Sequence, residues 1–500
     1  MTGSASESTT KVVPERKLSV KNMSAFGIGD TAGAFLSMAW GVTLLFYYQQ
    51  VVGVDAALVG TAIFIATLVD AISDPLVGAW SDRINTKWGR RHPMLLISTI
   101  PLGISFALLF MPPEGMSDTQ GFIWLTVFAV LVRFSWTFYQ IPHLSLGAEL
   151  IQTFEDRTKI FAYSAFIQSM SVAVAYGLIT AYFFRTTEDY DPGFLNPAGY
   201  PQMAISFACV MILAILTCAL GTRDQIPHLR QSEPVSRFSL STVFAEMWSV
   251  LKNSSFRAVF LGTLFASVIA GIESAFTPFL GIHFWGFQTE DLAYLVYVGL
   301  FGFPITFYLT PRIVKFLGRR MAVVVPLTLW TLAINIPISM RLLDAPWFPS
   351  NDSIWVLVIF IAYSYVGALC APLIGSSVNS MLADIADENE LETGVRREGV
   401  IYAFRAFTNK VTSSIGILIG GFLLKYIEFP EAAKRGSLSE DMIWNVGFIA
   451  GPATSIFTLG ALGFYFFYRI DRKRHEEILS ELAKRKSEEQ RKESGTAASS

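Results

Sequence analysis

No charged residue interrupts MAISFACVMILAILTCAL, the stretch from Met203 to Leu220. A helix needs about 20 mainly apolar residues to cross the ~30 Å hydrocarbon core of a membrane, and this stretch approaches that length. Similar uncharged stretches occur at Met94–Met111, Phe122–Val132 and Ile354–Ile374. The sequence therefore predicts an all-α membrane protein.

The composition of the whole chain agrees with a membrane location. Apolar residues make up 52% of the 500 residues and charged residues only 16%, and the mean hydropathy is +0.46. An ordinary soluble domain carries about 25% charged residues. Cys209, Cys218 and Cys370 lie within apolar stretches without metal-ligand or redox spacing. This placement indicates buried free thiols rather than a disulfide framework.

The apolar stretches predict twelve membrane spans. We place them at residues 24–51, 57–80, 93–111, 120–143, 158–184, 203–221, 255–281, 289–311, 321–341, 353–380, 399–426 and 443–468. Residues 1–20 lack the apolar core of a signal peptide, so we expect the first span to direct membrane insertion.

Basic residues are concentrated in every second connection between these spans. The connections at 81–92 and 312–320 each carry four Lys or Arg residues, whereas the connection at 112–119 carries none. The positive-inside rule then predicts that both termini and the 222–254 connection are cytoplasmic, in a multi-pass protein of the cell inner membrane. The exception is 427–442, which contains two basic residues.

Short motifs recur in the two parts of the chain. Gly89–Arg91 follows the second span and Gly318–Arg320 follows the eighth, and Pro142 recurs as Pro372 at nearly the same separation. These landmarks predict two six-helix halves in the same orientation, a parallel repeat. The predicted organisation is a cytoplasmic tail at 1–22, a first half at 23–221, a connecting loop at 222–254, a second half at 255–470 and a charged cytoplasmic tail at 471–500.

Two carboxylates stand out in the second span. Asp70 and Asp74 are four residues apart, which puts them on one helix face, one turn from each other. An ionisable group at the centre of a membrane helix costs about 2.5–3.5 kcal/mol, and two neighbouring carboxylates also repel each other unless a cation lies between them. The pair predicts a monovalent cation site with Asp70 and Asp74 as oxygen ligands, to Na⁺ if the cation is a metal, and Ser73 as an added oxygen. The alternative is an ion pair with a basic residue elsewhere.

Other ionisable residues in the spans are candidates for coupling or for substrate contact. Arg405 and Lys410 lie in the eleventh span, where either can meet the carboxylates, and an ammonium that competes with a bound cation would act as a switch. Arg133 and Glu273 are candidates for substrate binding. Alternatively, Arg133 bonds to nearby carbonyls and Glu273 ties two helices together. Asp30 lies near the start of the first span, where a partly hydrated carboxylate costs little.

The fourth span supplies a further pair of candidate substrate residues. Trp136 and Gln140 are four apart and share a helix face, so we expect them to face the cavity, where an aromatic ring can stack on a sugar. His143 is more typical of a packing histidine than of a proton relay. The glycines of Gly27–Gly33 indicate close helix packing, since they open a membrane helix and follow no strand.

Motifs for enzymatic chemistry are absent from the sequence. It contains no Gly-x4-Gly-Lys-Ser/Thr phosphate loop, no His-Glu-x2-His and no Gly-x-Ser-x-Gly elbow. We therefore expect a transporter rather than an enzyme, and an ion gradient rather than a nucleotide as the energy source.

Several motifs together resemble the glycoside-pentoside-hexuronide cation symporters of the major facilitator superfamily. Those that resemble its second helix and following loop are DAISDPLVGAWSDR (Asp70–Arg83) and WGRRHP (Trp88–Pro93). Those that resemble its fourth helix and loop are Tyr139–Pro142, Leu146–Leu150 and Glu155–Thr158. Met381–Asp384 and Lys410 complete the pattern, and the resemblance covers roughly residues 20–470.

This resemblance implies the major facilitator fold, with twelve helices in two six-helix halves around a central cavity. It implies symport of a sugar or glycoside by alternating access, in which Asp70 and Asp74 bind Na⁺, Li⁺ or H⁺ and Lys410 links the cation to the substrate. The residues implied to form a cytoplasmic latch are Asp82, Arg83, Arg90 and Arg91. We expect a monomer whose partners are a small-molecule substrate, a monovalent cation and the lipid bilayer, with no nucleic acid and no further cofactor.

The residues that bind the sugar in melibiose-type members are not present at the matching positions of this chain. In place of their two aspartates, arginine and tryptophan, this chain has Ala34, Gln140, Ala165 and Leu144. Ala406 stands where the family has a threonine cation ligand, so Na⁺ and H⁺ both remain open as the coupling cation. One alternative is a carrier of an amphipathic or anionic solute such as a lysolipid, whose acidic head would meet Arg405 or Lys410. A more remote one is a non-transporting membrane sensor.

Overall fold

The computed structural model describes residues 18–84, 86–150, 154–229, 251–394 and 398–497. Throughout these residues the regular structure is helical, apart from one isolated bridge between Thr86 and Gly89. The predicted all-α class is therefore confirmed.

The N-terminal half is built from the first six spans. Its first span is a continuous helical run of α1 (Val20–Met38), η1 (Ala39–Thr43), α2 (Leu44–Phe46) and η2 (Tyr47–Val52). The next spans are α3 (Ala56–Arg83), α4 (His92–Leu109), α5 (Asp118–Leu150), α6 (Phe154–Leu178) continued by η3 (Ile179–Phe183), and α7 (Gly199–Gly221). Side-chain caps mark where helices begin: the Ser19 hydroxyl accepts from Asn22 N, and the Asp55 carboxylate accepts from Ala57 N.

The C-terminal half contains the remaining spans. They are α9 (Ser254–Phe279) continued by η6 (Leu280–Phe284), α10 (Leu295–Leu342), α11 (Ile354–Thr393), α12 (Glu398–Tyr426), and α13 (Glu440–Phe448) continued by η8 (Ile449–Ala453) and α14 (Ser455–Phe466). Short connecting helices are η4 (Gly193–Leu195), η5 (Arg223–His228) and η7 (Thr289–Tyr294), and the tail forms α15 (Arg472–Ala497).

The described helices accommodate twelve spans. Ten helical segments are long and apolar enough to cross a membrane. α10 holds two spans rather than one, because Gly318 (φ 73°, ψ 163°) breaks it in the middle, and α12 is the eleventh predicted span. The charged tail forms a helix, α15, over most of its length.

Several helices extend beyond the predicted spans, among them α5, α6 and α11. α5 continues to Leu150 instead of 143, α6 begins at Phe154 instead of 158, and α11 continues to Thr393 instead of 380. The apolar pattern reports only the part of a helix that lipid surrounds, whereas the helical backbone continues into polar sequence outside the membrane.

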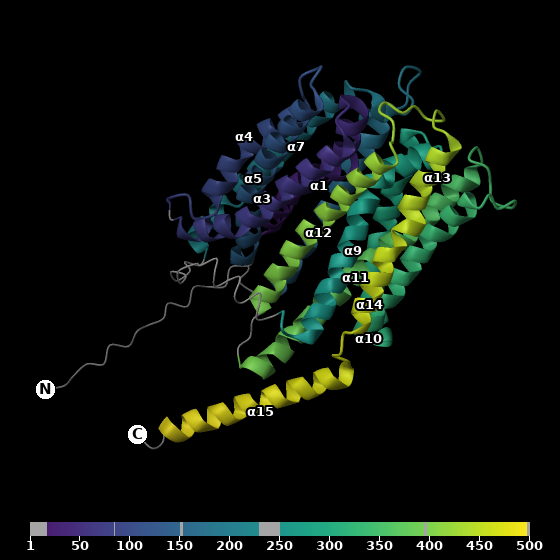
Figure 1. Ribbon diagram of the computed structural model, residues 1–500. Coiled ribbons are helices and arrows are strands. Elements are labelled where there is room, and N and C mark those ends of the chain that lie inside the picture. The colour runs from purple at the N-terminus through teal and green to yellow at the C-terminus, as the bar shows by residue number, and fades with distance from the viewer. Residues whose placement is uncertain (1–17, 85, 151–153, 230–250, 395–397, 498–500) are drawn as a thin grey trace.

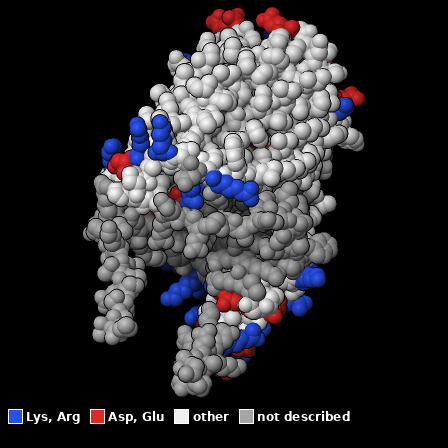
Figure 2. Space-filling model, turned by 90° about the vertical axis from the view of Figure 1, so that its left-hand side faces the viewer, with Lys and Arg blue, Asp and Glu red and all other residues white. Residues whose placement is uncertain are grey.

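The spans form two bundles that meet at one end and diverge toward the other (Figure 1). We call the end that carries α15 the inner end and the opposite end the outer end. Contacts between the halves run mainly along α3 and α12 and along α6 and α10. Figure 2 shows acidic residues at the outer end, Lys and Arg gathered toward the inner end, and a largely uncharged surface between them. This band is the expected lipid-facing surface.

Polar contacts join the two halves at the outer end. The Gln50 amide donates to Pro430 O (2.8 Å) and accepts from Ala433 N (2.9 Å). The Arg435 guanidinium forms a two-pronged ion pair with Asp191 (2.8 and 2.7 Å), and this hydrogen-bonded carboxylate raises the pKa of Arg435 above its ordinary value. The outer end is therefore closed in this conformation.

Replacing Arg435 with glutamine is expected to loosen the outer closure. The pair is partly exposed, with 29% of the Arg435 side chain and 38% of the Asp191 side chain accessible, so we expect it to contribute no more than about 1 kcal/mol, roughly a fivefold shift in population. Spin labels at Glu188 and Glu440, one on each half, should report an added population at longer distance. Lys434→Gln removes the neighbouring charge and should leave the distances unchanged. Identical distance distributions for Arg435→Gln and the parent protein would contradict this role.

Candidate functional site

The acidic pair of α3 meets a lysine of α12 between the two halves. Asp70 is fully buried, and Asp74 lies one turn further along the same helix face. The Lys410 Nζ lies 2.5 Å from Asp74 Oδ2 and 3.1 Å from Asp70 Oδ2. One ammonium thus bridges both carboxylates, although the two aspartates and the lysine come from different halves of the chain.

α5 contributes the rest of the Asp70 environment. The Thr137 hydroxyl donates to Asp70 Oδ1 (2.7 Å), and Arg133 Nη1 lies 3.9 Å from Asp70 Oδ2. The Arg133 guanidinium also stacks over the Trp40 ring, 4.1 Å from its centroid, which is a cation–π contact. Arg133 and Thr137 are one helical turn apart, so a single face of α5 provides both contacts.

Positive and negative charges are equal in number in this cluster, and some carboxylate oxygens accept no hydrogen bond. Two carboxylates face two cations, Lys410 and Arg133. Asp74 Oδ1 and Asp70 Oδ2 are buried and accept no hydrogen bond from the described residues. The contact between Asp70 Oδ2 and Lys410 is an ion pair. Carboxylate and hydroxyl oxygens are hard ligands, suited to a small monovalent cation or a proton. Within the described residues no group of three or more His, Cys, Asp or Glu residues could hold a metal ion.

Ser73 lies beside the acidic pair, and its role as an added oxygen ligand stays a prediction. Its hydroxyl donates to the Asp70 carbonyl (3.1 Å) and lies 3.3 Å from the Thr137 hydroxyl. Thr137 is a further residue of this site, because its hydroxyl donates to the Asp70 carboxylate.

Arg405 and Glu273 lie apart from the acidic pair. Arg405 is five residues before Lys410, which places the two side chains about 140° apart around α12. Arg405 and Glu273 line a cavity of about 240 Å³ within the C-terminal half, and Arg405 Nη2 donates to Gly375 O (3.3 Å). Glu273 also lines an adjoining cavity of about 330 Å³ with Trp330 and Tyr363. The expectation that Arg405 meets the carboxylates is not met in this conformation.

Asp30 belongs to a separate polar network of the N-terminal half. Its carboxylate pairs with His143 Nε2 (3.2 Å) and accepts a hydrogen bond from Ser164. His143 stacks on Phe26, with ring centroids 4.3 Å apart, and is thus a packing histidine with a polar partner. α1 and α5 approach closely here, since a Cβ at Gly29 would overlap the Tyr139 hydroxyl. This approach confirms the packing role predicted for the glycines.

Trp136 and Gln140 lie on α5, as does the Arg133 and Thr137 pair. Trp136 is 8% exposed and packs on Gly33, where a Cβ would come within 2.9 Å of the indole. The Gln140 side-chain oxygen is buried without a hydrogen-bond partner. An unsatisfied buried amide oxygen is a candidate acceptor for a substrate hydroxyl.

The latch arginines tie helices together at the inner end. Arg90 Nη2 and Arg91 Nη2 lie 3.0 and 2.8 Å from Glu149 Oε1, and Arg91 Nη1 donates to Ser81 (2.6 Å). Arg83 is exposed at the end of α3. The side chains of Asp82 and of Ala406 lie outside the described residues.

The C-terminal half repeats this arrangement. Arg319 pairs with Asp384, which also accepts a hydrogen bond from the Tyr468 hydroxyl (2.9 Å). Gly89 and Gly318, which precede the two arginines, both have positive φ (78° and 73°). The recurring sequence motif therefore has a glycine of positive φ in both halves, and an arginine that follows it reaches an acidic residue of a neighbouring helix.

Sequence reasoning missed Thr137, Trp40, Glu149 and Asp384 as members of these clusters. Thr137 follows Arg133 by four residues, so helical spacing could have predicted that the two share a helix face. Trp40 had none, because its contact depends on how α1 and α5 pack.

Comparisons with known proteins find a matching family and similar sequences. Residues 25–472 match the family model described as MFS/sugar transport protein. The chain is 25% identical to the uncharacterized symporter YjmB of Bacillus subtilis (strain 168) over 94% of this chain and 97% of that protein. It is 23% identical to the glucuronide carrier protein homolog of Escherichia coli (strain K12), over 95% and 98% of the two chains.

Solved structures match the fold at lower identity. A bacterial homolog of the human lysosomal transporter Spinster, in an inward-facing and unoccupied conformation, superposes with a TM-score of 0.59 and 13% identity. The match covers 92% of this chain and 97% of that one. A likeness at this identity supports the fold.

Proposed function

Because this chain belongs to the MFS/sugar transport protein family, we propose that it carries a sugar or glycoside together with a monovalent cation bound by Asp70 and Asp74. Membership in the family makes it a multi-pass membrane transporter and not an enzyme. Cation-coupled sugar symport is the function that the family and the relatives support. The observation that carries the cation site is the contact of one Lys410 ammonium with both carboxylates.

Lys410 places a positive charge at the proposed cation site. Its ammonium takes the position between the carboxylates that a coupling cation needs, so the two compete. When Na⁺ or H⁺ neutralises the pair, Lys410 is released from it. A cation that enters the site therefore changes the position of a charge in the central region, and it is this displacement that makes the site a switch.

α5 connects the cation site to the substrate. Arg133, Thr137 and Gln140 follow one another at spacings of four and three residues, so they share one helix face. Thr137 contacts Asp70, and Gln140 offers the unsatisfied oxygen one turn away. A substrate hydroxyl bound at Gln140 thus lies on the same helix face as the residues that hold the cation site.

A sugar or glycoside fits this protein better than a lysolipid. The family description names sugar transport, and one relative is named as a glucuronide carrier homolog, a glucuronide being a glycoside of an acidic sugar. The cavity that contains Glu273 also offers Trp330 and the buried Tyr363 hydroxyl, an aromatic and polar lining of the kind that binds sugar rings. The acidic pair and Lys410 are intact, which disfavours a non-transporting sensor.

Ligand-dependent thermal stability tests the assignment. We expect a glycoside or glucuronide to raise the melting temperature of the purified protein, more strongly in the presence of the coupling cation. A ligand at 100 times its Kd stabilises the folded state by about 2.7 kcal/mol. Sugars, glucuronides and lysolipids should be compared with and without Na⁺ and at two pH values. Stabilisation by lysolipids alone would overturn the sugar assignment.

Labelling of introduced cysteines tests the orientation, in which the inner end faces the cytoplasm. In a variant lacking the three native cysteines, Glu114→Cys at the outer end should react with a membrane-impermeant maleimide in whole cells. Lys87→Cys at the inner end should react only after the membrane is permeabilised. Both side chains are exposed, so burial cannot account for a difference. The reverse pattern would invert the topology.

A further inference from the structure

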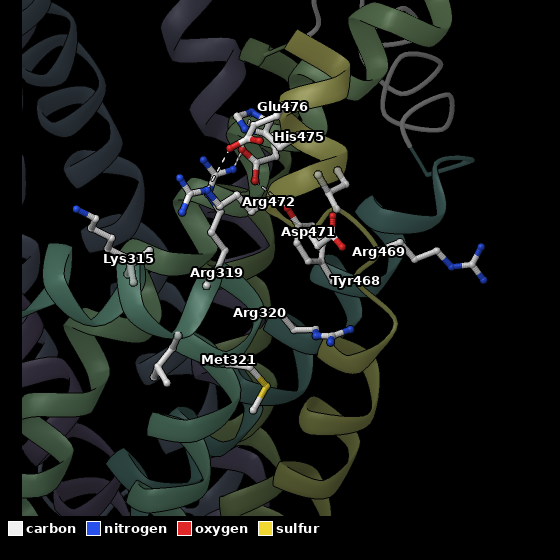
Figure 3. Close-up of a pocket in the computed structure, with 15 residues that line it drawn as sticks. Lys315, Arg319, Arg320, Met321, Tyr468, Arg469, Asp471, Arg472, His475 and Glu476 are labelled. Carbon is white, nitrogen blue, oxygen red and sulfur yellow. Dashed lines mark hydrogen bonds and ion pairs between the residues drawn. The ribbon is translucent and has the colours of Figure 1, made fainter. Parts of the chain in front are cut away.

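A cavity of about 510 Å³ lies at the inner end of the C-terminal half, outside the candidate transport site (Figure 3). One wall is the break of α10 around Gly318, and the other is the junction between α14 and α15, residues 468–476. Both walls lie at the ends of membrane spans, because α14 ends at Phe466 and α15 begins at Arg472. The cavity therefore opens where the membrane surface is expected.

The carboxylates of this cavity already have partners. Asp384 pairs with Arg319 and His475, the latter at 3.2 Å, and accepts a hydrogen bond from Tyr468. Glu476 pairs with Arg472 (3.1 Å). Asp471 caps the start of α15 by accepting from Arg474 N (2.8 Å). The negative charges of the lining are thus engaged within the protein.

Three cations of the lining take part in no such pair. Lys315, Arg320 and Arg469 border the cavity, and none of the ion pairs in the described part of the chain includes them. Figure 3 shows Lys315 and Arg469 at opposite edges, with their charged ends pointing away from each other, and Arg320 between them on the side of Arg469. Arg320 from the α10 wall and Arg469 from the α14–α15 junction thus place two cations without ion-pair partners among the described residues on one side of the cavity, an environment suited to a phosphate group.

Exposed aromatic side chains adjoin these cations. Phe316, next to Lys315, is 88% exposed, and Phe467, two residues before Arg469, is 66% exposed. Aromatic residues flanked by basic ones are typical of the membrane interface, where the ring contacts lipid and the cation contacts the headgroups. This pairing favours a lipid over a soluble anion as the occupant.

We propose that this cavity binds the phosphate-bearing headgroup of an anionic phospholipid, with Arg320 and Arg469 as its cationic ligands. Basic pockets between membrane helices bind such headgroups in other proteins. The bound lipid would join the α10 break to the start of α15 by bridging cations from both walls. This site is independent of the transported solute and of the cation bound by Asp70 and Asp74.

Lipid titration of the full-length protein in detergent, followed by native mass spectrometry, tests the proposal. Phosphatidylglycerol is the probe, with phosphatidylcholine and inorganic phosphate as comparison ligands. The double variant Arg320→Gln/Arg469→Gln removes one cation from each wall. The control Lys473→Gln/Arg474→Gln removes two charges from α15 that do not line the cavity. Melting curves establish that each variant is folded.

We expect one phosphatidylglycerol molecule to bind tightly to the parent and to the control. The lining variant should bind it roughly 30-fold more weakly, because each basic residue near an anionic lipid contributes about a factor of five. Phosphatidylcholine should bind weakly to all three proteins. Equal weakening in the lining variant and the control would show general surface attraction and overturn the proposal. Displacement of the lipid by millimolar inorganic phosphate would also overturn it, in favour of a soluble anion site.

Discussion

Replacing Asp74 or Asp70 with asparagine is expected to abolish cation-driven accumulation of the substrate. Moving one elementary charge through 100 mV supplies about 2.3 kcal/mol, which supports roughly 50-fold accumulation of a co-transported neutral solute. Without one carboxylate, the site loses one negative charge that would bind the cation. Lys410 then stays paired with the other carboxylate. The accumulation ratio measured in vesicles with an imposed membrane potential should therefore fall to about one, while exchange of substrate down its own gradient persists.

Two comparisons make this result specific. Asp55→Asn alters a carboxylate at the outer end of the same helix, where it pairs with Lys425, and should leave accumulation intact. The double variant Asp70→Asn/Asp74→Asn should be no worse than either single change, because both act on one site. If both single variants keep full accumulation with unchanged cation dependence, the carboxylates are structural and the proposed coupling is wrong.

Replacing Lys410 with glutamine is expected to make the stability of the protein depend on the coupling cation. The change leaves Asp70 and Asp74 close together. The remaining positive charge is Arg133, whose Nη1 lies 3.9 Å from Asp70 Oδ2. Removing one partner of a buried ion pair costs about 3–5 kcal/mol, and we expect less here because the Lys410 side chain is 25% exposed. Melting curves with and without Na⁺, and at low and high pH, should show a lowered melting temperature that one cation restores.

Lys425→Gln is the matched control for this experiment. Lys425 lies on the same helix and pairs with Asp55 at 3.0 Å, but its side chain is 57% exposed. Exposed pairs of this kind contribute about 0–1 kcal/mol, so we expect little loss and no response to the cation. Recovery of Lys410→Gln by Na⁺ would identify sodium coupling, and recovery at low pH alone would identify proton coupling. A lasting loss of stability that neither condition reverses would contradict the competition between Lys410 and the cation.

The sequence by itself determined the elements and their local relations. Uninterrupted apolar stretches such as Met203–Leu220 require a membrane helix, whatever their neighbours are. The four-residue spacing of Asp70 and Asp74 places both on one face of any α-helix. The repeated Gly-Arg-Arg motifs indicated two similar halves. Each of these inferences depends on residues close together in the chain, where helix geometry fixes the relative positions of side chains.

Only the tertiary structure decided which side chains meet across helices. From their positions in the eleventh span, Arg405 and Lys410 were both candidates for the acidic pair, and only the family resemblance pointed to Lys410. The rotation of α12 against α3 brings Lys410 to the carboxylates and turns Arg405 into the C-terminal cavity. The pairing of Asp30 with His143 and the docking of His475 on Asp384 depend in the same way on how helices pack. Helical periodicity specifies faces within one helix. The angle and rotation at which two helices cross depend on the packing of all their side chains, which no single stretch of sequence contains.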